Sequence, residues 1–98
     1  MYKDIITYEL AEGVTEEHLI NVAKKIIDGW MKSLKGFQKW EIHSLDDNSY
    51  TDIVYWDSKE AAKLAEADMM KMPNAAEWFM CYKEGTIEGK GLSLIAKF

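Results

Sequence analysis

Hydrophobic and polar residues alternate along two neighbouring segments, 37–45 and 50–56, which are separated by the polar cluster at 46–49. Alternation of this kind is typical of strands with one buried face, and turn-forming residues between two such runs predict a β-hairpin. The second run passes directly into the helix-start signal at 57–60. An alanine- and methionine-rich helix is therefore expected over about 59–70.

The turn residues suggest a register for this hairpin. If the turn closes at Asp47-Asn48, Leu45 lies opposite Tyr50 and His43 lies opposite Asp52. Since side chains alternate between the two faces of a strand, two sets follow. One face would carry Trp40, Ile42, Ile53 and Tyr55, and the other Lys39, Glu41, His43, Asp52, Val54 and Trp56. The first set is typical of a core, but either face could line a pocket.

The rest of the chain supplies four further elements. A β-branched and aromatic run predicts a strand over 4–10. Thr15 is a suitable N-cap for a helix whose apolar stripe continues to Leu34, with Gly36 placed to end it. After Pro73 a short helix is expected over 74–83, followed by a last strand over 86–98. Gly89 and Gly91 in that strand indicate a bulge or a close approach to another backbone.

This order of elements, β-α-β-β-α-(α)-β, is that of a ferredoxin-like α+β fold. It predicts a single domain over 1–98, with a four-stranded antiparallel sheet and helices on one face. Large apolar residues occur on both faces of the hairpin, so the face without helices needs a partner. We expect that partner to be a second copy of the chain, packed sheet against sheet about a two-fold axis.

Composition and charge narrow the function classes. The chain has 98 residues and a net charge of −5, and all twelve of its basic side chains are lysines. An acidic chain without arginine argues against a nucleic-acid partner and against bidentate capture of phosphate. No apolar run approaches the length of a membrane span, and neither end looks like a targeting signal. The lone Cys81 suits a reducing compartment, so we expect a cytoplasmic protein without a membrane partner.

Two stretches carry a resemblance to a known family. They are Leu34-Lys35-Gly36-Phe37 before the hairpin and the run 54–62, Val-Tyr-Trp-Asp-Ser-Lys-Glu-Ala-Ala. In this order the chain resembles the dimeric α+β barrel superfamily, and most of all its antibiotic-biosynthesis-monooxygenase-like members. The resemblance implies two ferredoxin-like subunits that join their sheets, each with a small pocket. It also implies activities that include cofactor-free oxygenation of aromatic substrates and haem degradation.

Haem degradation fits this sequence poorly. The haem-degrading members use an asparagine on the first strand, and a tryptophan and a histidine on or after the second helix. Here the first strand has no asparagine, and the stretch 61–80 has no histidine. The mechanism of those members is therefore not expected.

His43 and Asp52 are the candidate catalytic pair. In the register above their Cβ atoms would lie about 5 Å apart, and a carboxylate that orients an imidazole is a general-base arrangement. The alternative is a solvent-exposed cross-strand pair with no chemical role. Trp56 would lie on the same face, where it could stack on a planar ligand, belong to the core or partner Lys39.

A second group of residues surrounds the break at Pro73. Trp78, Tyr82 and Met69 could line an adaptable apolar pocket, or they could simply fill a core. Cys81 has no partner that would mark it as a nucleophile, His18 lies in a first helical turn, and no spacing supports a metal site.

Two functions follow as hypotheses. The first is a cofactor-free monooxygenase-like enzyme acting on a small, planar and mostly apolar molecule. The second is a non-catalytic homodimer that binds a small apolar ligand, haem included. A buried His43 that faces a cavity would favour the enzyme.

Overall fold

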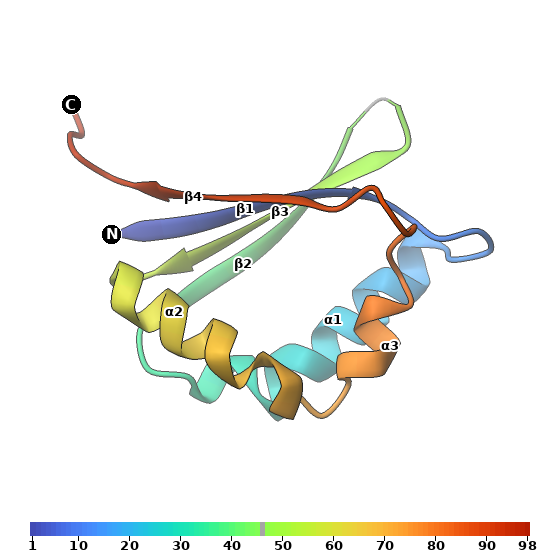
Figure 1. Ribbon diagram of the computed structural model, residues 1–98, viewed down its shortest axis with the longest axis horizontal. Helices are drawn as coiled ribbons and strands as arrows, with labels where there is room; N and C mark the ends of the chain where they lie inside the picture. The colour runs from blue at the N-terminus through green and yellow to red at the C-terminus, as the bar shows by residue number, and fades with distance from the viewer. Residues whose placement is uncertain (46) are drawn as a thin grey trace.

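The computed structural model describes residues 1–45 and 47–98. Four antiparallel strands form one sheet in the order β2-β3-β1-β4, and all the helices lie on one side of it (Figure 1). The strands are β1 (Tyr2–Glu9), β2 (Phe37–Ser44), β3 (Ser49–Trp56) and β4 (Glu88–Ser93). The helices are α1 (Glu16–Gly29), α2 (Lys59–Asp68) and α3 (Ala75–Phe79), with 3₁₀ turns η1 (Met31–Ser33) and η2 (Met69–Lys71). This is the ferredoxin-like α+β fold that the element order predicts.

Helix α1 begins as the sequence predicts but ends earlier. The Thr15 side chain accepts a hydrogen bond from the His18 backbone N–H at 3.1 Å, which caps the helix. The apolar stripe packs against the sheet through Leu19, Val22, Ala23 and Ile26, all buried. The predicted end at Gly36 is wrong, because Trp30 leaves the helical conformation at φ −150° and a 3₁₀ turn follows.

Gly36 instead shapes the turn into β2. Its φ is +86°, a conformation that residues with a Cβ atom adopt only at a cost. A Cβ atom built at this position would lie 2.6 Å from the Cβ atom of Ala61 on α2. Gly36 therefore allows α2 to pack closely against the chain that enters β2.

The hairpin between β2 and β3 forms, but its predicted register is wrong by one residue. The Leu45 N–H donates to the Ser49 carbonyl at 2.8 Å, and Asn48 has a φ of +67°. As a result Ile42, not His43, lies opposite Asp52. The predicted turn used Asp47-Asn48 as its tip, and a left-handed Asn48 closes the turn one position earlier.

A one-residue slip changes which side chains share a face. Asp52 and Val54 now share the helix-covered face with their partners Ile42 and Trp40. Trp56 lies on this face as well. The two predicted side-chain sets are therefore wrong. The open face of the sheet instead carries Lys39, Glu41, His43, Ile53 and Tyr55.

Strand β4 is an exposed edge strand that pairs with β1 in a regular ladder. The sequence predicted that its glycines mark a bulge or a close approach to another backbone, and the structure shows neither. Gly91 lies opposite Asp4, and a Cβ atom there would collide with the hydroxyl end of the Tyr2 ring. The glycine thus leaves room for Tyr2 to lie across β4.

Candidate functional site

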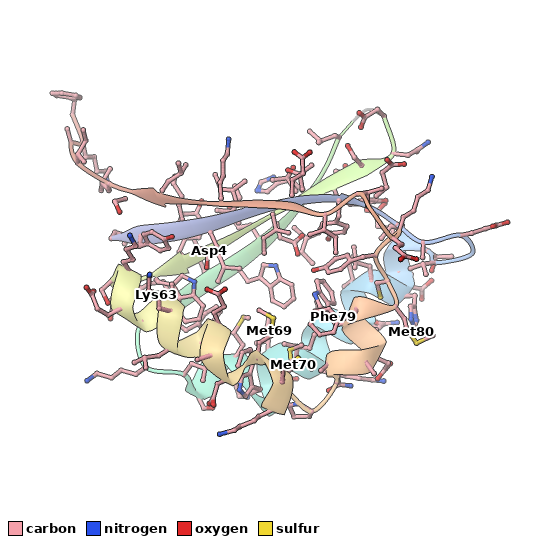
Figure 2. The ribbon with its side chains drawn as sticks, viewed as in Figure 1. Asp4, Lys63, Met69, Met70, Phe79 and Met80 are labelled. Carbon is pink, nitrogen blue, oxygen red and sulfur yellow. The ribbon has the colours of Figure 1, made fainter. Side chains whose placement is uncertain are left out.

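A cavity of about 510 Å³ lies between the sheet and the helices. Its walls are mostly apolar, and all four tryptophans of the chain line it: Trp30, Trp40, Trp56 and Trp78. Met31, Met69 and Met72 add flexible apolar surface, and Figure 2 shows Met69 in the space between the sheet and α2. Flat aromatic walls and adaptable methionines suit a planar apolar molecule.

Asp52 is a carboxyl group inside this mostly apolar site. It is 1% exposed and lies on β3, where it accepts a hydrogen bond from the Tyr8 hydroxyl at 2.7 Å. Burial raises the pKa of Asp52 to about 7, because the charged form loses its hydration. The Tyr8 hydrogen bond, the Trp40 indole and the charge of His43 oppose that rise. A carboxyl group with such a pKa can exchange a proton with a ligand near neutral pH.

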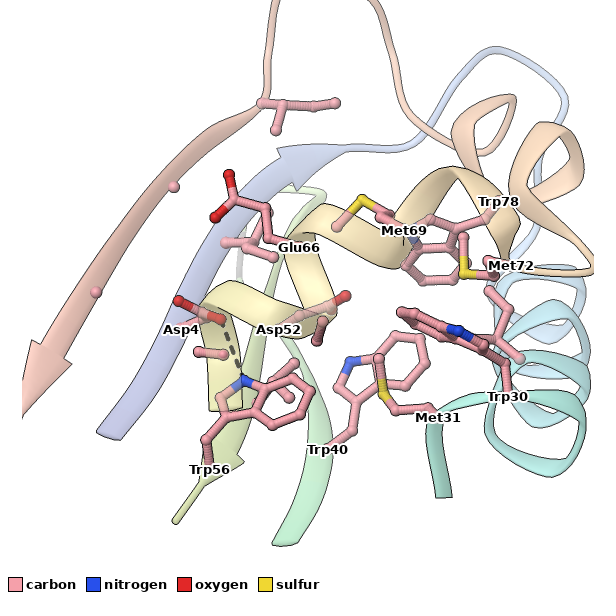
Figure 3. Close-up of a pocket in the computed structure, with 18 of the residues that line it drawn as sticks. Asp4, Trp30, Met31, Trp40, Asp52, Trp56, Glu66, Met69, Met72 and Trp78 are labelled. Carbon is pink, nitrogen blue, oxygen red and sulfur yellow. Dashed lines mark hydrogen bonds between the residues drawn. The ribbon is translucent and has the colours of Figure 1, made fainter. Parts of the chain in front are cut away.

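The indole N–H of Trp40 is a donor without a partner. Among the described residues, Trp40 Nε1 is the buried side-chain nitrogen or oxygen that lacks a hydrogen bond. It lies on the side of the ring that faces Asp52 (Figure 3), and its interaction with that carboxyl group lowers the Asp52 pKa, although the two groups do not form a hydrogen bond of ordinary geometry. A buried N–H without a partner is costly, so a ligand oxygen at this position would be stabilised.

An aromatic cluster forms the end of the cavity beside Asp52. The ring centroid of Tyr82 lies 4.5 Å from that of Tyr8 and 5.3 Å from that of Trp78. Trp78 in turn packs edge-on against Trp40, with 5.1 Å between the ring centroids. Burial and the Asp52 charge raise the pKa of both tyrosines, so their hydroxyls stay protonated, and that of Tyr8 donates to Asp52.

A pair of carboxyl groups, Asp4 and Glu66, lines the cavity at the other end. Trp56 Nε1 donates to Asp4 Oδ2 at 3.2 Å, and Glu66 of α2 lies nearby (Figure 3). Burial raises the pKa of Asp4, the hydrogen bond from Trp56 lowers it, and the like charge of Glu66 raises it. Asp4 and Asp52 lie on the same face of adjacent strands, since Asp4 pairs with Val54 and Asp52 with Ile6.

The structure brings most of the predicted site residues together and separates one of them. Asp52, Trp56, Trp78, Tyr82 and Met69 all line the cavity. His43 does not belong to this lining, because the one-residue slip turns it to the open face. Its side chain is 53% exposed and lies 3.2 Å from Glu41. The predicted opposition of His43 and Asp52 is therefore wrong.

Several site residues were not predicted from the sequence, among them Asp4, Tyr8, Trp40 and Glu66. For Asp4 and Tyr8, the alternation of residue types along the strand could have indicated their place in the site. Tyr2, Asp4, Ile6 and Tyr8 form one alternating set on β1, and Tyr50, Asp52, Val54 and Trp56 form the matching set on β3. A carboxyl group in an otherwise aromatic and apolar set marks a buried polar site.

Two further properties concern metals and membranes. Across residues 1–45 and 47–98, no three histidine, cysteine or acidic side chains are arranged to hold a metal ion. In that same part of the chain, no helix has the length and apolar character needed to cross a bilayer.

Solved structures define the class to which this fold corresponds. SnoaB, a cofactor-independent oxygenase from Streptomyces nogalater, superimposes with a TM-score of 0.75 at 17% identity, over 98% of this chain and 94% of that one. A monooxygenase from the gene ActVA-Orf6 of Streptomyces coelicolor, in complex with nanaomycin D, gives 0.74 at 14% identity, over 99% and 89%.

A dimeric ferredoxin-like protein from an uncultured marine organism gives a TM-score of 0.65 at 14% identity, over 99% of this chain and 90% of that one. No family model and no curated protein matches the sequence. Two further solved structures with this fold are putative antibiotic biosynthesis monooxygenases from Chloroflexus aurantiacus and Nitrosomonas europaea, each with a TM-score of 0.69, which confirms the resemblance at the level of fold.

Proposed function

We propose that the protein is a cofactor-independent monooxygenase-like enzyme that acts on a small, planar, mostly apolar molecule in this cavity. The observation that carries the proposal is the position of Asp52, a buried carboxyl group in an aromatic pocket. Burial there raises its pKa to about 7. The similarity in fold to a cofactor-independent oxygenase supports the same reaction class. Trp56, Trp78, Tyr82 and Met69 would hold the ring system.

Asp52 would act as a general base. The hydrogen bonds found among the described residues use only one of its oxygens, so the other is available to accept a proton from the ligand. A substrate with a weakly acidic C–H or O–H group would lose that proton to Asp52. The Trp40 N–H would donate to the oxygen on which the resulting negative charge accumulates.

The electrons for oxygen activation would come from the substrate itself. In the simplest balanced case, a CH₂ group between two aromatic rings and one O₂ give a carbonyl group and one H₂O. The carbon loses four electrons and two hydrogens, one oxygen atom enters the product and the other leaves as water. This balance needs no reductant other than the deprotonated substrate.

The open face of the sheet supports a homodimer as part of this proposal. Ile5, Ile53 and Tyr55 lie on the side away from the helices, partly exposed beside a charged group of Lys39, Glu41 and His43. A second copy packed on this face would cover the apolar residues. We also propose a cytoplasmic location, since a single buried Cys81 suits a reducing compartment.

An oxygen electrode tests the catalytic proposal. Anthrone, which has a CH₂ group between two aromatic rings, should be oxidised faster with the protein than without it. Asp52→Asn should remove most of that acceleration, whereas Glu84→Gln, an equal change in net charge at an exposed site, should not. No acceleration by the wild-type protein would contradict the enzyme.

The alternative is a non-catalytic protein that binds a small apolar ligand, haem included. The methionine and tryptophan walls of the cavity support it, because they suit binding without requiring any chemistry. It predicts saturable binding of anthraquinone or haemin without oxygen uptake. Binding measured by quenching of tryptophan fluorescence separates the two functions, because both predict quenching and only the enzyme predicts turnover.

A further inference from the structure

Two polar groups at the inner end of the cavity have hydrogen-bonding capacity that the protein does not use. The Asp52 carboxyl group is 1% exposed and accepts a hydrogen bond from the Tyr8 hydroxyl through Oδ1, while its Oδ2 accepts none from residues 1–45 and 47–98. Trp40 Nε1 is a buried donor without a hydrogen bond in the same part of the chain. Asp52 and Trp40 both line the cavity. Buried polar groups are nearly always paired, so these two point to a ligand.

The two groups differ in what they can bond. An indole N–H only donates, whereas an ionised carboxyl group only accepts. They lie side by side, since Trp40 pairs with Val54, two residues along β3 from Asp52. The Trp40 N–H faces the carboxyl group without forming a hydrogen bond of ordinary geometry (Figure 3). A ligand group that satisfies both must therefore accept from Trp40 and donate to Asp52.

A hydroxyl group is the simplest substituent that does both. Its oxygen can accept the Trp40 N–H while its proton is donated to Asp52 Oδ2. A ketone or ether oxygen can accept from Trp40 but has no proton for the carboxylate. An ammonium group can donate to the carboxylate but has no lone pair for Trp40, and a ring C–H satisfies neither.

The titratable groups around Asp52 leave it as the acceptor for that proton. Burial and the Asp52 charge raise the pKa of Tyr8 and of Tyr82, so both stay protonated. His43 lies on the open face of the sheet and acts on Asp52 through its charge. Among the residues that the helices contribute to the described lining, Glu66 is the charged one, and it lies on the β4 side of the cavity (Figure 3).

We propose that Asp52 and Trp40 form a hydroxyl subsite, in which a hydroxyl group on the ring system of the ligand donates its proton to Asp52 and accepts the Trp40 N–H on its oxygen. This inference deepens the proposed function and rests on it, because it takes the same cavity and selects an O–H rather than a C–H as the group that Asp52 deprotonates. A phenol carries such a hydroxyl group, and so does the enol tautomer of anthrone. Deprotonation would leave the negative charge on the oxygen that Trp40 already contacts.

Three probes with one ring system test the proposal: 9-phenanthrol, 9-methoxyphenanthrene and phenanthrene. Their binding is followed by quenching of tryptophan fluorescence in the absence of oxygen, so that no turnover occurs. Among the three, 9-phenanthrol alone can donate to Asp52. It should bind at least about tenfold more tightly than either of the others when Asp52 is ionised, since a hydrogen bond to a charged group is worth about that factor.

Matched variants assign this preference to the two residues. Asp52→Asn removes the charged acceptor, so the preference for 9-phenanthrol over its ether should fall to within about threefold, because a neutral hydrogen bond is about half as strong. Trp40→Phe removes the N–H and should reduce the preference for 9-phenanthrol over phenanthrene about fivefold. Trp30→Phe, the same change at another indole of the cavity, should leave both ratios unchanged. Thermal unfolding of each variant shows that the fold is kept.

The pH dependence of binding is a readout that packing alone would not change. Burial raises the pKa of Asp52 to about 7, so its charged form becomes populated between about pH 6 and pH 8. The affinity for 9-phenanthrol should rise across this range, because the carboxylate accepts the hydroxyl proton. The affinity for phenanthrene should not change, and Asp52→Asn should abolish the rise for 9-phenanthrol.

The outcomes separate this proposal from the proposed function. Equal affinity for 9-phenanthrol and its ether, or a preference that Asp52→Asn leaves intact, would overturn the hydroxyl subsite, and oxygen uptake from anthrone would then still support the enzyme. Binding of none of the three probes would contradict the cavity as a site for planar molecules, and both proposals with it. A hydroxyl preference without oxygen uptake from anthrone would retain the subsite and remove the enzyme.

Discussion

At the scale of single residues, two opposing influences set the protonation state of Asp52 that the proposed chemistry requires. It is buried among aromatic rings, which disfavours its charge, and it is held by the Tyr8 hydroxyl, which favours that charge. The balance places its pKa at about 7, where both protonation states are populated in a neutral solution.

The contribution of Tyr8 can be isolated. Tyr8→Phe removes a hydrogen bond that stabilises the carboxylate, so the Asp52 pKa should rise above its value of about 7. Carboxyl ¹³C NMR as a function of pH measures this directly. Tyr55→Phe is the matched control, because the Tyr55 hydroxyl donates to Glu41 on the other face of the sheet. An Asp52 titration that Tyr8→Phe leaves unchanged would show that this hydrogen bond has no role.

Asp52 should also make stability depend on pH. The folded pKa is raised above the unfolded value near 4, so between about pH 4 and pH 7 the native state binds more protons than the unfolded state. The free energy of unfolding should therefore fall as pH rises through this window, by about 1.4 kcal/mol for each unit of pKa difference.

Urea unfolding of Asp52→Asn tests this dependence. The variant cannot ionise at position 52, so it should gain stability relative to the wild type between pH 4 and pH 7. Asp28→Asn, a change of the same charge on the surface of α1, should follow the wild type. A pH dependence shared by all three proteins would place the pKa of Asp52 near its ordinary value.

At the scale of elements, the strands and helices follow from sequence pattern, whereas their exact pairing does not. The period-two runs predicted β1, β2 and β3, and the Thr15 cap and apolar stripe predicted α1. Their bounds moved by a few residues, most at the end of α1. The hairpin register depended on the backbone conformation of Asn48, which no hydrophobic pattern encodes, and the pairing of His43 with Asp52 was wrong for that reason.

Gly36 provides a test of how closely α2 packs at the entry to β2. Gly36→Ala and Gly13→Ala both place a Cβ atom at a φ above +80°, which costs about 1 kcal/mol in each case. Only at Gly36 does the new atom also meet another residue, Ala61. Chemical denaturation should therefore show Gly36→Ala as the more destabilising change by about 1–3 kcal/mol. Equal losses would mean that α2 does not pack against this turn.

At the scale of the whole molecule, the cavity depends on contributions from distant parts of the chain. Asp4 comes from the first strand, Trp30 and Met31 from the turn that follows α1, and Trp78 from α3. The sequence predicted Trp56 as a ligand contact from its place on the hairpin, and Trp78, Tyr82 and Met69 because flexible methionines and aromatics around the Pro73 break can line an apolar pocket. It could not predict that Asp4 and Trp40 share their pocket, because that depends on the order of strands in the sheet.

The open sheet face should carry the dimer contact. Light scattering at micromolar concentration should give about twice the 11.3 kDa of one chain. Ile53→Glu introduces a charge into the middle of that face and should yield monomers. Leu64→Glu changes an exposed leucine on α2, on the helical side, and should leave the dimer intact. A monomeric wild-type protein would contradict packing through the sheet.

The pH profile of kcat/KM for anthrone oxidation tests whether Asp52, and not His43, is the base of an oxygenase. We expect kcat/KM to rise through a pKa near 7 in the wild type and in His43→Ala alike, and Asp52→Asn to lose both the rate and the rise. A profile that persists in Asp52→Asn, or that disappears in His43→Ala, would contradict that role of Asp52.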